Sequence, residues 1–116
     1  MKRLLILSFC ILSLSSCDSD NKPDGLLSQD KMVKVLIDIH LTEGLTSAMP
    51  VTYDSSKVLY NLLEKDVFLK HAVSDSVFTQ SMLYYLRDPA EMEQIYSRVV
   101  DSLVVRESSN GIIDQF

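Results

Sequence analysis

The segment that follows Ser28 constrains the fold most, because it is apolar around most of its circumference when it is drawn as a helix. At helical spacing a broad face, on which His40 and Gly44 also fall, carries most of its apolar side chains: Met32, Val33, Val35, Leu36, Ile37, Ile39, Leu41 and Ala48. Ser28 predicts the N-cap, and Met49-Pro50 predicts an end near Ala48, because the residue before proline avoids the helical region. A helix with so narrow a polar strip is expected at the centre of a small bundle.

Two shorter helices are predicted next. The first begins near Asp54 or Ser55, ends near Lys70 or His71, and turns Val58, Leu59, Leu62 and Leu63 inward. The second is capped by Ser74, with Val73 and Phe78 spaced as a hydrophobic staple. Its inward side chains are expected to be Phe78, Met82, Tyr85 and Leu86.

The clearest local signal is Asp88-Pro89-Ala90-Glu91, which starts a fourth helix. Asp88 predicts the cap, Pro89 the first helical position, and Glu91 the residue that reaches back in a capping box. The core positions that follow are Met92, Ile95, Tyr96, Val99 and Leu103. We expect the helix to end by about Glu107. The fold class is therefore all-α, a bundle of about four helices over residues 28–107, with a disordered tail at 108–116.

The first seventeen residues have the parts of a bacterial lipoprotein signal. Lys2 and Arg3 precede an apolar run from Leu4 to Leu14, and Ser15-Ser16-Cys17 follows. The run is too short for a transmembrane helix, which needs roughly twenty apolar residues. An ordinary secretory signal is the alternative, but it favours an Ala-x-Ala-like ending and does not require Cys17. We predict that residues 1–16 are removed and that Cys17 carries a covalent lipid, with no other cofactor.

A polar stretch separates Cys17 from the predicted helices. Residues 18–25 contain no apolar side chain other than Pro23, and they combine acidic residues with proline and glycine. Such composition is typical of a flexible tether. Residues 17–27 are therefore predicted to link the lipid to the domain.

Charge and composition exclude several functional classes. Removal of residues 1–16 takes away Lys2 and Arg3 and no acidic residue, which leaves nine basic and sixteen acidic side chains and a net charge of −7. No nucleic-acid partner is expected of so acidic a chain. Cys10 leaves with the signal, and two histidines cannot form a three-histidine metal site. No small-molecule substrate is expected either, since no catalytic or nucleotide-binding signature is present.

Three stretches resemble a family of small Bacteroidota lipoproteins known as domain of unknown function 4296. They run from Leu26 to Glu43, from Leu69 to Tyr85, and from Asp88 to Tyr96. The resemblance implies a helical, lipid-anchored envelope protein and no known activity. At Ala72 the chain departs from the glycine expected of the family at a left-handed helix terminus.

One polar pair interrupts the apolar face of the first helix. His40 and Glu43 are three residues apart and therefore neighbours. They could hold a metal or act as a base and its orienting partner, satisfy each other or a tyrosine inside the bundle, or line a groove for a partner. We favour the interpretation that the pair is satisfied inside the bundle, because no further metal ligand accompanies it. Tyr84 is the candidate surface aromatic.

Together these features predict a non-enzymatic envelope protein, attached to the membrane through lipid on Cys17, that binds or scaffolds another envelope protein. The expected location is the outer membrane. The alternative is a small metal-binding protein or metal-assisted hydrolase that uses His40 and Glu43. These two hypotheses differ in whether purified protein holds stoichiometric metal.

Overall fold

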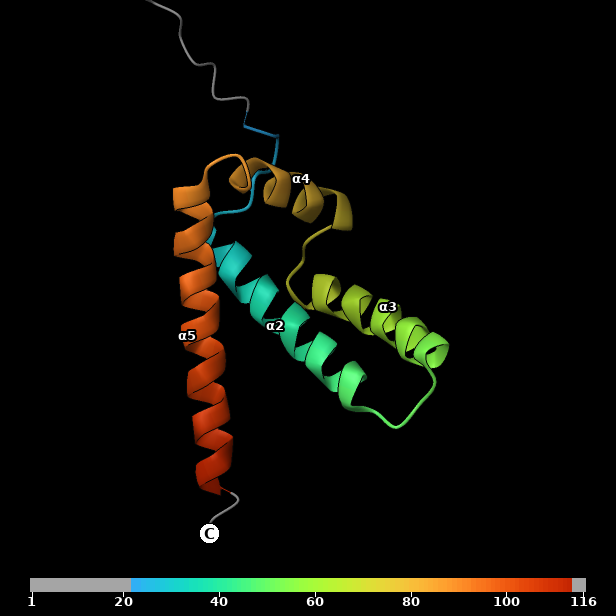
Figure 1. The fold of residues 1–116 in the computed structure, drawn as a ribbon. Helices are drawn as coiled ribbons and strands as arrows, with labels where there is room; N and C mark the ends of the chain where they lie inside the picture. Colours follow the sequence, from blue (N-terminus) through green and yellow to red (C-terminus); the bar gives the residue numbers. More distant parts are fainter. Residues whose placement is uncertain (1–21, 114–116) are drawn as a thin grey trace, which may run out of the picture.

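The computed structural model describes residues 22–113, which form four helices and no strand (Figure 1). They are α2 (Gln29–Ala48), α3 (Tyr53–Lys70), α4 (Asp75–Tyr85) and α5 (Pro89–Ile113). The predicted all-α class is confirmed. The predicted signal and Cys17 lie outside the described residues.

The helices begin at side chains that accept hydrogen bonds from the first turn. Ser28, Thr52, Ser74 and Asp88 receive backbone N–H groups of Lys31 at 3.2 Å, Ser55 at 3.3 Å, Val77 at 3.2 Å and Ala90 at 3.0 Å. Three of these caps were predicted, whereas α3 begins slightly earlier than the sequence indicated. The capping box at Asp88 is incomplete, because its N–H donates to the carbonyl of Tyr85 at 3.1 Å and not to Glu91.

The helix α2 is central, as predicted, because it contacts each of the other three helices. One face packs with α4 and α5 in a core cluster of Met32, Val33, Leu36, Ile37, Tyr85, Met92, Ile95 and Val99. A second cluster joins it to the end of α3 through Val35, Ile39, Val67, Phe68 and Val73. In α5 and at the end of α4, two predicted core residues lie outside: Leu86 is 56% exposed and Tyr96 is 36% exposed. Tyr96 lies beside His40 of α2, so its ring is only partly covered.

The segment before α2, residues 23–27, packs on the domain. Leu26 donates its N–H to the carbonyl of Pro23 at 3.1 Å, and Gly25 has a φ of 75°, which together form a tight turn. Leu27 donates to Ser81 Oγ at 3.0 Å and accepts at its carbonyl from Tyr85 Oη at 2.7 Å. The predicted tether was therefore too long at its C-terminal side, because these partly buried hydrogen bonds fix Leu27 to α4.

The turn between α3 and α4 has the geometry of a Schellman motif. Val73 N–H donates to the carbonyl of Phe68 at 2.9 Å, and Ala72 N–H donates to that of Leu69 at 3.1 Å. Ala72 has a φ of 53°, the left-handed conformation that usually selects glycine. The departure noted in the sequence thus falls on a backbone position that is strained for alanine.

The last helix is longer than predicted. It continues to Ile113, whereas the sequence indicated an end by Glu107 and a disordered tail at 108–116. Ser108 and Ser109 donate their hydroxyls to the carbonyls of Val104 at 2.9 Å and Val105 at 2.8 Å, so these polar side chains are satisfied within the helix. Residues 114–116 lie outside the described residues.

Candidate functional site

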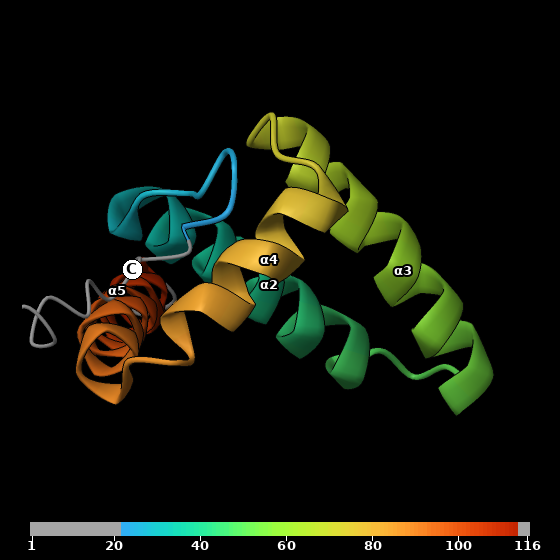
Figure 2. The ribbon, with the colours of Figure 1, turned by 90° about the horizontal axis from the view of Figure 1, so that it is seen from above.

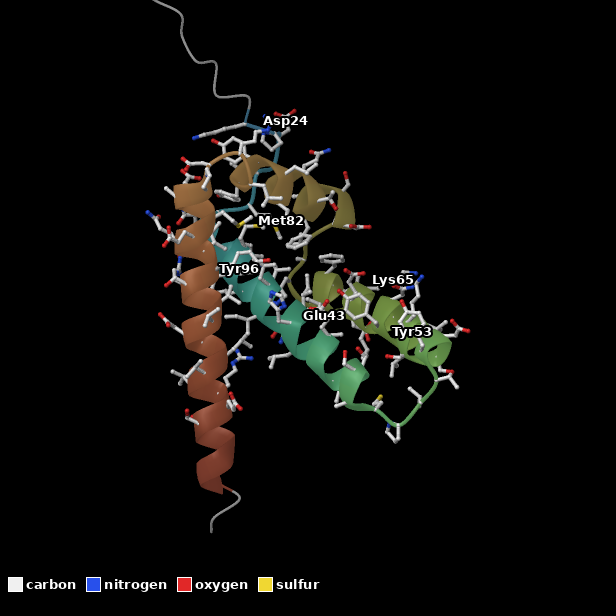
Figure 3. The ribbon with its side chains drawn as sticks, viewed as in Figure 1. Asp24, Glu43, Tyr53, Lys65, Met82 and Tyr96 are labelled. Carbon is white, nitrogen blue, oxygen red and sulfur yellow. The ribbon has the colours of Figure 1, made fainter. Side chains whose placement is uncertain are left out.

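The pair of His40 and Glu43 is formed, but it lies nearer the surface than the sequence predicted. Glu43 Oε2 is 3.2 Å from His40 Nδ1, and the two side chains are 58% and 34% exposed, respectively. Tyr96 of α5 lies beside the imidazole, with 6.0 Å between the ring centroids. Figure 3 shows Glu43 on α2, and Tyr96 where α5 lies beside α2. The two residues satisfy each other at the surface, and the prediction of a buried pair was wrong.

The surroundings of this pair do not complete a metal-binding set. Within residues 22–113, no group of three or more histidine, cysteine, aspartate or glutamate side chains is arranged to hold a metal ion. Neither His40 nor Glu43 therefore gains a third ligand from the described part of the chain.

Asp38 forms the most connected polar site, which sequence reasoning missed. Its Oδ2 is 2.7 Å from His71 Nε2 and 2.8 Å from Lys70 Nζ, and its Oδ1 is 3.8 Å from Arg106 Nη1. The carboxylate is only 14% exposed. It links α2 to the end of α3 and to α5.

The electrostatics of Asp38 follow from these contacts. Burial alone would raise the pKa of the carboxyl, but hydrogen bonds from Lys70 and His71 outweigh burial and hold the pKa below its ordinary value. An ionised carboxylate only accepts hydrogen bonds, so His71 Nε2 carries the proton of the shared bond. His71 lies at the C-cap position of α3, and its backbone N–H donates to the Val67 carbonyl at 3.1 Å. Its ring fastens α3 to α2.

Tyr84, the predicted surface aromatic residue, is not fully exposed. It is half-buried against the first core cluster, and its ring meets that of Tyr85 edge to face, with 5.4 Å between the centroids. The more exposed apolar residue beside it is Leu83, at 56%.

The distal half of the α2–α3 hairpin, residues 41–66, has no buried apolar side chain. In α2 the buried apolar residues end at Ile39, and in α3 they begin at Val67. Val58 and Leu62, predicted to point inward, are 61% and 56% exposed. Further exposed apolar side chains along this stretch are Leu41, Leu45, Met49, Val51 and Tyr53. The apolar side chains have the predicted helical spacing, but no described helix covers them.

Two shallow hollows follow the hairpin. One has a volume of about 430 Å³ between the two helices and is lined by Asp38, Leu41, Thr42, Leu45, Leu63, Asp66, Val67 and Lys70. The other, also about 430 Å³, lies on α3 and is lined by Asp54, Ser55, Val58, Leu59 and Leu62. Both combine an apolar floor with a few polar groups at the rim.

A hydrogen bond joins the two arms of the hairpin in the half that has no buried apolar side chain. Ser56 donates its hydroxyl to the Thr46 carbonyl at 2.9 Å, and Thr46 is the only buried residue of this part of α2. Tyr60 donates to Glu64 at 3.3 Å, and burial together with Glu64 and Glu43 raises its pKa to about 12. The Tyr60–Glu64 bond lies within α3, so the bond from Ser56 to Thr46 is the one that joins the two arms here, while many apolar side chains stay exposed.

The fold and these sites define a small all-helical domain with an exposed apolar hairpin. None of the described helices is both long and apolar enough to cross a bilayer. The family described as "Domain of unknown function (DUF4296)" matches residues 23–109, and the chain belongs to this family. No curated protein matches the chain, and no solved structure does.

Proposed function

We propose that this protein is a non-enzymatic module of the bacterial cell envelope, anchored by lipid on Cys17 in the outer membrane, that binds another envelope protein. The anchor is supported by the sequence around Cys17. A single acyl chain gives marginal membrane attachment, whereas several chains on one cysteine give stable anchoring.

The observation that carries the binding role is the uncovered apolar hairpin. Exposed apolar residues scattered singly are normal, but contiguous apolar surface marks sites of interaction. Here the apolar side chains follow both helices of one hairpin and surround two hollows. A partner with an apolar helix or loop would bury them.

The position of the hairpin suits this role. Figure 3 shows Asp24 at one end of the molecule and Tyr53, which starts α3, far from it. The helix α2 spans that separation with 20 residues, about 30 Å at 1.5 Å per residue. A domain anchored through the residues before Asp24 would hold the hairpin away from its membrane, where an envelope partner can reach it.

Crosslinking in intact cells, followed by recovery of the protein and mass spectrometry, tests the proposal. The wild type is compared with Cys17→Ala, which removes the anchor, and with Val58→Lys, which charges the hairpin. Val105→Lys is the matched control, because Val105 on α5 is 64% exposed and Val58 is 61% exposed. We expect one adduct with the wild type and the control, and its loss in the other two variants.

Monomer alone in all four strains would contradict the binding role. An adduct that persists in Val58→Lys would place the partner elsewhere on the domain. Wild-type protein that is released from membranes as readily as Cys17→Ala would contradict the anchor.

A further inference from the structure

The outer face of α4 also exposes apolar side chains, at the end of the molecule opposite the hairpin loop. Leu83 and Leu86 are each 56% exposed and three residues apart, so they are neighbours on this face. Residues 76–86 contain no charged side chain, and Arg87 follows them. Figure 1 shows α4 lying across the end of the molecule where α5 begins, and Figure 2, seen from above, shows it in front of α2.

The chain leaves the domain toward Cys17 from this same face. Pro23 lines a hollow of about 140 Å³ together with Gln80, Leu83, Tyr84 and Arg87. Lys22 directly precedes Pro23, and Cys17 lies five residues before Lys22. Because an extended chain spans at most about 3.6 Å per residue, the Cα atom of Cys17 lies within about 18 Å of that of Lys22.

We infer that α4 rests on the surface of the bilayer that holds the Cys17 lipid, with Leu83 and Leu86 entering the interfacial region. This inference rests on the proposed anchor. The short reach from Lys22 keeps the α4 face close to the headgroups. An uncharged helix face with exposed leucines inserts shallowly into that region, about 5–10 Å deep.

The charged side chains near the outer face of α4 are compatible with shallow insertion of that face into the bilayer. Arg87 and Lys22 have long side chains that reach phosphate groups while their stems stay in apolar surroundings. Asp24 and Asp88 lie at the same end, so the contact depends on the leucines and on the anchor, not on a net positive charge. Tyr84, half-buried between Leu83 and the core, has the amphipathic ring that favours a membrane interface.

Quenching of a fluorophore by lipid tests this orientation. The full, lipidated protein is purified from membranes and reconstituted in vesicles of phosphatidylethanolamine and phosphatidylglycerol. A nitrobenzoxadiazole label is attached to Leu83→Cys or to Leu62→Cys, the matched control, since each leucine is 56% exposed. With Cys10 removed and Cys17 blocked by lipid, the introduced cysteine is the only free thiol.

We expect a lipid with a shallow nitroxide to quench the label at position 83 several-fold more strongly than the label at position 62. Equal, weak quenching at both positions on protein that floats with the vesicles would overturn the inference and leave the anchor intact. Protein that does not float with vesicles at all would overturn the anchor and the inference together.

A second measurement separates the bilayer from a protein occupant. A photoactivated crosslinker at Leu83 in intact cells is expected to give lipid adducts of the full chain. A discrete protein adduct at this position would show that another protein covers α4, and it would overturn the inference even if vesicles quench the label.

Discussion

Asp38 joins three helices through one carboxylate group. Its partners Lys70 and His71 are 32 and 33 positions away in the sequence, and Arg106 lies on the last helix. Helical periodicity correctly placed Asp38 off the apolar face, but periodicity does not say which helix packs beside that strip. The site could not be predicted because its partners are set by the docking of α3, not by local pattern.

Loss of the Asp38 charge is expected to weaken this junction. Asp38→Asn should lower the free energy of unfolding by about 1–2 kcal/mol, because it removes charge-assisted hydrogen bonds from a largely buried position. Urea denaturation measures the change. Asp66→Asn is the control, since Asp66 is exposed in the same hollow, and its change should stay within about 0.5 kcal/mol. Equal losses in both variants would contradict the role of Asp38.

The contacts of Asp38 also predict that the free energy of unfolding depends on pH. The pKa of Asp38 is lowered from its ordinary value of 3.8, so its stabilisation is complete above that value. It is lost as the pH falls from 3.8 through the lowered pKa of the folded state. The difference between wild type and Asp38→Asn should therefore narrow only in that acidic range, as urea denaturation at successive pH values would show.

Ala72 has the backbone conformation of a glycine. Replacement by glycine should raise the free energy of unfolding by up to about 1 kcal/mol, because relief of the left-handed strain exceeds the added entropy of the unfolded chain. Ala48→Gly, at the end of α2, is the control and should destabilise by about 0.5–1 kcal/mol. Thermal unfolding followed by circular dichroism compares them. A lower melting temperature for Ala72→Gly would contradict this interpretation.

At the scale of elements, three helix caps and the end of α2 were the most predictable features. Ser28, Ser74 and Asp88 cap their helices, and Met49 ends α2, because each signal acts within a few residues. Burial was less predictable. Val58 and Leu62 have core spacing, but a stripe is buried only where another element covers it, and α3 has such a cover only near Val67 and Phe68.

The hairpin should therefore open locally while the rest of the fold stays closed. Amide hydrogen exchange is expected to be slow for Leu36 and Ile39, within the core, and fast for Ala48 and Leu62, in the distal half. Ser56→Ala removes the bond to Thr46 and should speed exchange in the distal half alone. Equally slow amide exchange along the whole of α2 would contradict local opening of the distal half.

At the scale of the whole molecule, both core clusters share α2. Ile95 is fully buried, so Ile95→Ala should cost about 2–5 kcal/mol, whereas Val100→Ala, at a site 53% exposed on the same helix, should cost far less. Because α2 belongs to both clusters, we expect one cooperative transition. Urea unfolding monitored by circular dichroism and by the NMR signals of Phe68 should coincide. Two separate transitions would show that the clusters unfold independently.

The central position of α2 also determines how the domain would carry mechanical load. Its N-terminus adjoins the segment that Tyr85 and Ser81 fix by hydrogen bonds. Its C-terminal half forms one arm of the hairpin and leads to α3. Tension between a membrane at one end and a bound partner at the other would pass along the axis of this one helix. The hairpin, with few buried contacts, would yield first and release the partner while the core stays folded.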